Sequence, residues 1–579
     1  MNTNIRAPRH RQEGYALVTV VVLGGVSLAI LASTLTWTTN NANFNARHNQ
    51  YLESLAAAEA ATEKVLSSLS VDYQAAGAAA VHSRMSSYAA MVPVTAESAY
   101  WSGYEFSNAQ GDVGQTYVAA TSPWGVSPLI SQYQGLQGYA ANFRIVSNAK
   151  RRSSQFDITG AVGQDVQLAT VPLFQFAIFY NMDLEINPGP NMTVRGRVHS
   201  NGHLYAQPQA TLRFVGDVTA AGEIIHGKMP EDPLNRSGGT IIYDAEHDGG
   251  VNSLNLPIGH DDDNSPASVR QIVEMPPVGE LPESQLGKER FYNKADMIVL
   301  VYDNRVETFG GLPATGNPTI PWSTASSFIR TNVTFFNKRE GKTVKATVLD
   351  VGQLRSYNNT SNPLKTALGH DISSVYIKDL RTQTTDTQPG IKVINGQTLP
   401  PSGLTIATPQ PLYVQGHYNA PSSALGTANT SQTKPAALIA DAITVLSGGW
   451  VDGDSTSSLS TRDAQHTTVN AAFLAGIVKT TSASYNDGVE NFPRFLEDWG
   501  GRTFTYNGSM VVMYESQVAT ALWRGTGSTI GIYNPPTRNW NFDNNFLDPT
   551  KLPPGTPAAR TLIRGQWTVL PPNTTSVEL

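Results

Sequence analysis

Residues 15–37 read YALVTVVVLGGVSLAILASTLTW, an uncharged and mostly apolar run that begins at Tyr15 and ends at Trp37. About 20 such residues in a helix, at about 1.5 Å rise per residue, cross the roughly 30 Å hydrocarbon core of a bilayer. The run is therefore expected to be a transmembrane helix. Basic residues precede it and none follows it closely, which places the N-terminus in the cytoplasm and the rest of the chain outside it.

The leader in residues 1–14 is short and basic, with Arg6, Arg9 and Arg11, and it ends at Gly14 immediately before Tyr15. A secretory signal peptide is cut after its apolar core. Here the plausible processing point, between Gly14 and Tyr15, lies before the core. Cleavage there would remove the basic leader and keep the apolar helix on the mature protein. The alternative is a single-pass anchor that is never cleaved.

The helix is expected to continue beyond the apolar run. Residues 40–70 contain neither proline nor glycine and are rich in alanine, leucine and glutamate, which favour helices. Leu52, Leu55, Leu66 and Leu69 recur at helical spacing and share one face. The pattern predicts one continuous helix to about residue 70, apolar all round in its first half and amphipathic in its second.

This N-terminus resembles those of type IV prepilins, through the Gly14–Tyr15 junction, the long helix and the AAEAA stretch at residues 57–61. Most pilins carry glutamate five residues after the cleavage point, and here Thr19 stands there, as in PilX-type minor pilins. The resemblance implies cleavage by a prepilin peptidase and residence in the inner membrane before assembly. It further implies assembly with other pilins and minor pilins in a type IV pilus or a type II secretion-like filament. A low-copy place near the filament tip, with display at the cell surface, follows by analogy.

Composition favours a β-rich extracytoplasmic body. Charged residues make up 15% of the chain, below the roughly 25% of average domains, while 49 glycines and 35 prolines supply turns. The absence of cysteine excludes disulfides, iron–sulfur clusters and thiol catalysis. A net charge of −6 provides no basic footprint, so nucleic acid is not an expected partner. The length suggests two to four domains.

The sequence divides into four regions. These are the leader at 1–14, the helix at 15–70, an α+β connecting region at 71–170 that looks like a pilin head, and a β-rich domain at 171–579. Short alternating strands, such as those near residues 143–147 and 156–162, support the α+β assignment. The fold class is therefore α+β, mainly β.

The β-rich domain carries a repeat near 20 residues, seen where Gly196-Arg197-Val198 is followed by Gly216-Asp217-Val218. A fixed period of this size predicts a parallel β-solenoid. A β-sandwich with short hairpins is the alternative. The period is lost at about residues 229–400, which we interpret as an insertion, and residues from Trp523 onward are expected to form an irregular tail that closes one end.

Candidate metal ligands are few and weak. His199 and His203 are four apart, but Asn201-Gly202 between them indicates a turn instead of a helix. Asp261, Asp262 and Asp263 offer oxygen ligands for Ca²⁺ without the spacing of a calcium loop. The same is true of the pair in the segment from Asp452 to Asp454. A solvated acidic loop is the simpler interpretation, and no metal or cofactor is expected.

Glu497 and Asp498 are the closest approach to a catalytic pair. Two carboxylates flank the bond in glycoside hydrolysis, but adjacent residues on a strand face opposite ways. A structural ion pair involving Arg494 is the simpler interpretation. Gly-x-Ser-x-Gly, phosphate-loop and dinucleotide motifs are absent from the sequence. We therefore expect no catalytic site.

Two classes of function compete. The first is a minor pilin or pseudopilin, a subunit for filament assembly and display that could also be adhesive. The second is a membrane-anchored β-solenoid that binds or acts on carbohydrate. Surface glycans are candidate partners in both, because tyrosines and tryptophans are frequent in the β-rich domain. Residues 6–69 favour the first class.

Overall fold

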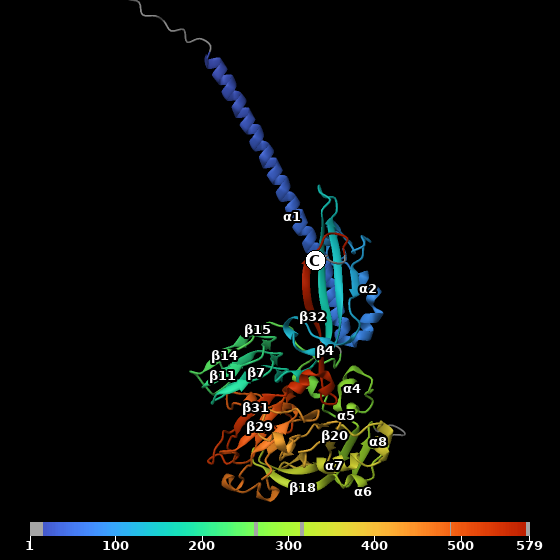
Figure 1. The fold of residues 1–579 in the computed structure, drawn as a ribbon, viewed down its shortest axis with the longest axis vertical. Coiled ribbons are helices and arrows are strands. Elements are labelled where there is room, and N and C mark those ends of the chain that lie inside the picture. Colours follow the sequence, from blue (N-terminus) through green and yellow to red (C-terminus); the bar gives the residue numbers. More distant parts are fainter. Residues whose placement is uncertain (1–14, 260–263, 313–317, 487, 575–579) are drawn as a thin grey trace, which may run out of the picture.

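The structure is a computed structural model that describes residues 15–259, 264–312, 318–486 and 488–574. A long helix projects from a sheet-containing head, and a larger β-rich body lies beyond the head along the same long axis (Figure 1). The expected α+β class, with a long helix packed on a β-rich protein, is confirmed.

Helix α1 (Tyr15–Ser83) is longer than the sequence predicts. It continues past residue 70 because the alanine-rich segment that follows stays helical up to a kink at Gly77, whose φ is 73°. Glycine adopts this left-handed conformation without the steric penalty of a Cβ. The short helix α2 (Met85–Ala89) then turns the chain toward the head.

The head is an antiparallel six-stranded sheet against which the second half of α1 packs. Val65, Leu66 and Leu69 of the helix contact Phe143 and Leu168 of the sheet in one buried cluster. The strands are β1 (Tyr104–Ser107), β2 (Tyr117–Ala120), β3 (Gly125–Pro128), β4 (Gln137–Arg151), β5 (Thr159–Pro172) and β32 (Ala558–Val569).

Strand β32 corrects the prediction of an irregular C-terminal tail. It pairs antiparallel with β5 along most of its length, from Ala558 opposite Pro172 to Val569 opposite Val162. Before it, β31 (Thr537–Phe542) extends a parallel sheet of the body. The prolines and tryptophans that suggested irregularity lie around these strands. A local sequence pattern cannot reveal the pairing of β32 with β5, because the two strands are almost 400 residues apart.

The first part of the body confirms the 20-residue spacing. Its parallel strands stack so that Leu184, Leu204 and Ile224 are in register, and Val198 lies opposite Val218. The strands are β6 (Ile178–Tyr180), β7 (Leu184–Ile186), β8 (Met192–Val194), β9 (Val198–Ser200), β10 (Leu204–Ala206), β11 (Thr211–Phe214), β12 (Val218–Ala220), β13 (Ile224–Ile225), β14 (Thr240–Tyr243) and β15 (His247–Gly249).

Polar side chains follow the same spacing as the strands. Asn201 donates to the Asn181 side chain, 20 residues earlier, at 2.8 Å, and the backbone N–H of Gln207 donates to the Asn187 side chain at 2.7 Å. Buried backbone and amide groups need such partners. The ladders are therefore held by side chains as well as by strand pairing.

The second part of the body starts at the far end of the same large sheet and returns. The sheet order is β15-β12-β9-β6-β30-β27-β24-β22-β20-β16-β17, so that Met510 of β30 pairs in parallel with Ile178 of β6. Its strands are β16 (Met297–Val301), β17 (Val306–Gly310), β18 (Ile329–Asn337), β19 (Lys342–Asp350), β20 (Ser374–Asp379), β21 (Thr387–Ile394), β22 (Leu404–Ala407), β23 (Leu412–Gln415), β24 (Ala436–Ala440), β25 (Ile443–Leu446), β26 (Thr467–Asn470), β27 (Ala472–Ile477), β28 (Pro493–Phe495), β29 (Thr503–Gly508) and β30 (Met510–Glu515).

These strands correct the predicted insertion at residues 229–400. Strands β14, β15, β16, β20 and β21 all fall within this range and pair in parallel with other strands of the body, whereas the described residues between 250 and 296 form no strand of these sheets. The connections between these strands are long and include helices α6 (Trp322–Ala325), α7 (Val351–Asn358) and α8 (Pro363–Leu368), so the fixed period disappears although the stacking continues. Apart from the β16–β17 and β18–β19 hairpins, the body's strands pair in parallel, unlike the hairpins of a sandwich.

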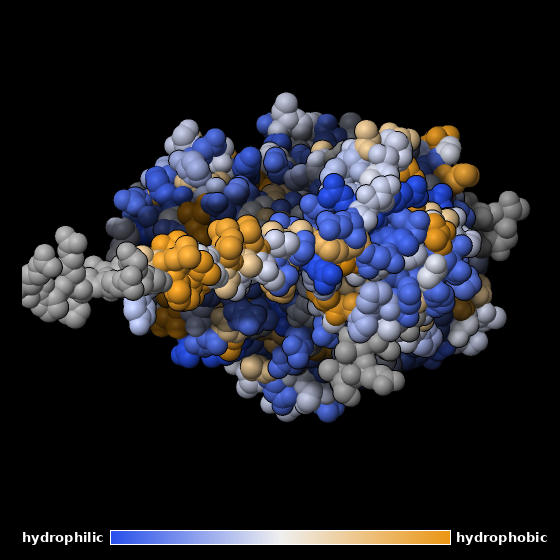
Figure 2. Space-filling model, turned by 90° about the horizontal axis from the view of Figure 1, so that it is seen from above, coloured by the Kyte–Doolittle hydropathy of each residue, from blue (hydrophilic) through white to orange (hydrophobic). Residues whose placement is uncertain are grey.

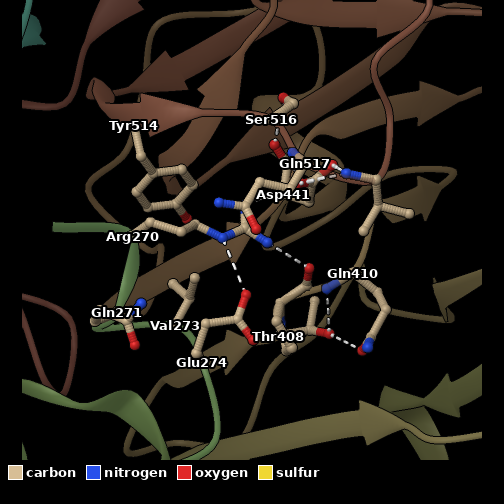
Figure 3. Close-up of polar contacts among 12 residues, drawn as sticks. Arg270, Gln271, Val273, Glu274, Thr408, Gln410, Asp441, Tyr514, Ser516 and Gln517 are labelled. Atoms are coloured by element: carbon tan, nitrogen blue, oxygen red, sulfur yellow. Dashed lines mark hydrogen bonds and ion pairs between the residues drawn. The ribbon is translucent and has the colours of Figure 1, made fainter. Parts of the chain in front are cut away.

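A connector at residues 250–296 joins the two ends of the large sheet, and it includes α3 (Pro266–Arg270), α4 (Gln285–Glu289) and α5 (Phe291–Lys294). Arg270 attaches it to the body (Figure 3). Its guanidinium lies 2.7 Å from the Asp441 carboxylate, 4.9 Å from the centre of the Tyr514 ring, and donates to the Pro409 carbonyl at 2.8 Å. Arg270 and Asp441 are both buried, so one ion pair fixes the connector to two parts of the ladder.

Candidate functional site

The first half of α1 projects from the head and is exposed along its length (Figure 1). Every residue from Tyr15 to Phe44 and on to Asn49 is exposed, and Gln50 is the first buried one. This helix is the one candidate membrane span among the described residues, with a mean hydropathy of 2.4 in its most apolar window. In Figure 2 its apolar side chains form an orange stalk against a mostly hydrophilic surface. So large an exposed apolar surface indicates a partner or a membrane.

The polar atoms of this exposed half are adapted to an apolar environment. No charged residue occurs between Tyr15 and Arg47. The Thr19 hydroxyl donates to the Tyr15 carbonyl at 2.7 Å, and the Thr36 hydroxyl donates to the Ala32 carbonyl at 2.8 Å. Because each hydroxyl is already hydrogen-bonded within the helix, moving it out of water costs less than moving an unpaired hydroxyl.

Gly24 and Gly25 lie within the exposed half, where the helix remains continuous. A Cβ added at either position would have no atom within 4 Å among the described residues. The pair therefore has no packing partner among the described residues.

The second half of α1 docks through small residues. Ala57, Ala58 and Ala61 are buried against the head, whereas Glu59 within the same AAEAA stretch is exposed. The helix backbone lies so close to β5 that a Cβ on Gly160 would lie 2.5 Å from the Leu55 nitrogen. The alanine-rich stretch, singled out from the sequence as a family feature, therefore allows close approach of helix and sheet.

Ion pairs fix the docked half along its length. Arg564 of β32 makes two contacts with the Glu63 carboxylate, at 2.5 and 2.8 Å, and Arg151 of β4 lies 2.7 Å from the Glu53 carboxylate. These groups are largely exposed and contribute little energy. The Arg564 pair shows that the C-terminal strand β32 is part of the surface on which the helix docks, which sequence patterns did not reveal.

The predicted processing point lies at the edge of the described chain. Gly14 is outside the described residues, and Tyr15 is the first described one, with 88% of its surface exposed. Asp261, Asp262 and Asp263 also lie outside the described residues. Within the part of the chain that the structure does describe, no group of three or more histidine and acidic side chains is placed to hold a metal ion.

The two histidines have separate structural partners. His199 is buried, its Nδ1 lies 2.8 Å from the Thr219 hydroxyl, and burial lowers its pKa to about 4. The His203 Nδ1 accepts from the backbone N–H of Glu223 at 3.0 Å. Both bonds link residues 20 apart, so the two histidines connect successive turns of the ladders and do not face a common metal site.

The carboxylates at 497 and 498 also have separate partners. Glu497 is buried and accepts from both the backbone N–H and the hydroxyl of Ser447 at 2.6 Å, and burial raises its pKa to about 7. Asp498 accepts from the Asn534 side chain at 2.8 Å. Arg494 forms an ion pair with Glu340 at 3.0 Å, so the structural ion pair expected here has a different acid.

The Asp452 carboxylate is likewise used within the fold. The Asp452 carboxylate lies 2.6 Å from the Lys392 ammonium and accepts from the Trp450 indole N–H at 2.8 Å. A carboxylate that is paired with a cation and an indole in this way is occupied by the protein itself. The site that stands out is therefore the projecting apolar helix.

Comparisons with known proteins add little to this geometry. No family model and no curated protein matches the sequence. Among solved structures, the chain is similar to the competence-associated pilin ComZ from Thermus thermophilus, with 10% sequence identity and a TM-score of 0.30, over 90% of this chain and 97% of that one. A likeness at this level carries no argument about function, so the assignment depends on the helix.

Proposed function

We propose that the protein is a type IV pilin-like subunit of the PilX minor-pilin type. One observation carries the proposal: α1 is a single helix whose first half is apolar, uncharged and exposed, while its second half is docked on an antiparallel sheet. A plain anchor needs only the span. A subunit that moves from a membrane into a filament needs the same apolar half to be covered first by lipid and then by neighbouring helices.

The proposed sequence of events begins with insertion in the inner membrane, N-terminus in the cytoplasm and body outside. A prepilin peptidase cuts between Gly14 and Tyr15 and leaves the helix on the mature protein. The helix then packs among other pilins and minor pilins. The head and body stay outside the filament core, because the head packs on the second half of α1 and leaves the first half uncovered.

A tip position follows from two features. Thr19 has no carboxylate to offer the N-terminal amine of a neighbouring subunit, and its hydroxyl is already bonded to the Tyr15 carbonyl. Leaving such an amine buried and unpaired is costly. The body at residues 171–579 would also crowd a lattice of small subunits. Both features suit a low-copy subunit at one end of a filament.

The body is proposed to be a parallel β-solenoid, on the strength of its stacked parallel strands and 20-residue register. We assign it no catalytic role, because Glu497 and Asp498 are engaged with separate partners. Its role is display at the cell surface, with adhesion as the accompanying activity.

Gold labelling of the body on isolated filaments tests the proposal. Label at one end of each filament, together with even label from an antibody against the major subunit of the same filaments, is the expected result. Label distributed evenly along the shaft would contradict the tip position, and filaments that carry no label would contradict filament assembly.

A further inference from the structure

A cleft opens where the two parts of the body meet. In the large sheet the junction is closed, because β6 pairs with both β9 and β30. On a neighbouring face, β8 is the last strand of the sheet β14-β11-β8 and β31 is the last strand of β26-β29-β31, and the two are not paired in the described chain. A cavity of about 480 Å³ lies between the beginnings of β8 and β31. This volume falls in the range of small-ligand sites, roughly 300–1,000 Å³.

Prolines keep this junction open and do not suit an added strand. Pro188 and Pro190 precede β8, Pro536 precedes β31, and all three line the cleft. Proline has no N–H to donate to a strand ladder, and it blocks pairing at sheet edges. At the other end, Phe542 closes the junction, since a Cβ on Gly196 would lie 2.9 Å from its ring. An extended peptide would find few backbone partners here.

The cleft is positively charged although the chain as a whole is negative. Arg195 is exposed at its wall, and none of the described residues forms an ion pair or hydrogen bond with its guanidinium. Arg538 adds a second cation and donates to the Glu490 carbonyl at 3.1 Å. Glu490 also lines the cleft, and its buried carboxylate forms an ion pair with Arg236 at 3.2 Å. The two arginines at the wall are therefore available to an anion.

The remaining lining combines flat apolar surfaces with amides. The Arg538 guanidinium lies 5.3 Å from the centre of the Trp540 ring, which holds both side chains at the wall. Asn191 and Asn539 contribute amide groups beside the proline rings. Sites that fix a small ligand combine apolar surfaces with a few placed polar groups, and arginine matches a carboxylate with two parallel hydrogen bonds.

We propose that this cleft binds an acidic saccharide, with the carboxylate on Arg195 and Arg538 and the sugar rings against Trp540 and the exposed Pro190. The proposal goes beyond a filament role and does not depend on it, because it concerns the body alone. A carboxylated sugar matches both the charge and the mixed lining, whereas a peptide strand is opposed by the prolines.

Isothermal titration calorimetry on the full chain in detergent tests the site with three probes of similar size. Trigalacturonate, a trimer of carboxylated sugars, is expected to bind and to weaken as salt is raised. Maltotriose, a neutral trimer, is expected to bind at least tenfold more weakly. Triglutamate is expected to behave like maltotriose. No binding of trigalacturonate, or equal binding of triglutamate, would overturn the proposal.

Two arginine variants locate the binding. Arg195→Ala removes an exposed side chain and should weaken trigalacturonate binding about tenfold, the effect of losing one charge-assisted hydrogen bond. Arg330→Ala removes an exposed arginine on β18, outside the cleft, and should leave binding unchanged. Equal affinity of Arg195→Ala and wild type would place the binding elsewhere and overturn the assignment. The measurement uses no filament, so its failure is separate from failure of the pilin proposal.

Discussion

At the scale of single residues, Arg270 carries the attachment of the connector to the body. Its side chain and that of Asp441 are 2% and 0% exposed (Figure 3). Asp441 also accepts hydrogen bonds from the backbone N–H groups of Gln517 and Ala519. Removing one partner of a buried pair leaves an uncompensated buried charge. Removing Arg270 alone is therefore expected to cost more stability than the intact ion pair contributes.

We expect Arg270→Ala to lower the free energy of unfolding of the body by about 3–5 kcal/mol. Denaturant unfolding of the full chain in detergent measures this change. Arg305→Ala is the matched control, because Arg305 pairs with Glu307 at 2.7 Å while largely exposed, and its loss should change the free energy by less than about 1 kcal/mol. Equal effects of the two variants would show that burial of the Arg270 pair is unimportant.

Glu497 is expected to make stability depend on pH. Burial raises its pKa from 4.5 to about 7, so the folded protein holds this proton more tightly than the unfolded chain does. Its stabilising contribution is complete below about pH 4.5 and is lost as the pH rises through about 7. The loss is on the order of 3 kcal/mol.

Glu497→Gln should remove this part of the pH dependence, because glutamine stays neutral and its carbonyl can still accept from Ser447. The free energy of unfolding measured between pH 4.5 and 7.5 would then fall less steeply than in the wild type. Glu515→Gln, at an exposed position on β30, serves as control and should keep the wild-type slope. An unchanged slope in Glu497→Gln would contradict the assignment of this proton.

At the scale of elements, the docking of α1 depends on close approach to β5. Gly160→Val places a side chain where a Cβ already lies 2.5 Å from the Leu55 nitrogen and 2.7 Å from the Ser54 carbonyl carbon. Because the obstacle is helix backbone, the helix has to move away. We expect a cost of about 1–3 kcal/mol and faster protease cleavage within residues 50–83.

Gly125→Val on β3 is the matched control, since a Cβ there has no atom within 4 Å. Limited proteolysis of both variants, with the time course of cleavage followed by mass spectrometry, tests whether α1 is loosened from β5. Protection of residues 50–83 in Gly160→Val equal to that in the wild type would mean that the helix does not need this contact.

Local sequence patterns predicted helices and strands well wherever apolar residues recur at a regular spacing. The apolar run and the absence of proline and glycine predicted α1, and the spacing of Val198 and Val218 predicted their pairing. Long connections removed the period after residue 229, so the parallel pairing of β16 with β20 and of β21 with β23 was not predicted. The docking role of Ala57 and Ala61 could not be predicted, because the residues they pack against, such as Ala149 and Val162, lie about 90–100 residues away.

At the scale of the whole molecule, the order of strands was beyond the reach of the sequence. The chain leaves the large sheet at β15, follows the connector, and returns from β16 to meet β6 through β30. It then passes back to the head, where Leu562 of β32 faces Leu168 of β5. These pairings join residues more than 300 apart and arise from burial in three dimensions. The cleft beside Arg195 is a product of this return, so the candidate site there was also invisible in sequence patterns.

The central claim is that the projecting helix is the mature N-terminus of a filament subunit. N-terminal sequencing of the protein recovered from a host that has a prepilin peptidase tests it most directly. The account predicts that the mature chain begins at Tyr15, and that Gly14→Leu, which places a bulky residue at the cleavage point, keeps the leader. A mature wild-type chain that still begins at Met1 in that host would contradict the account.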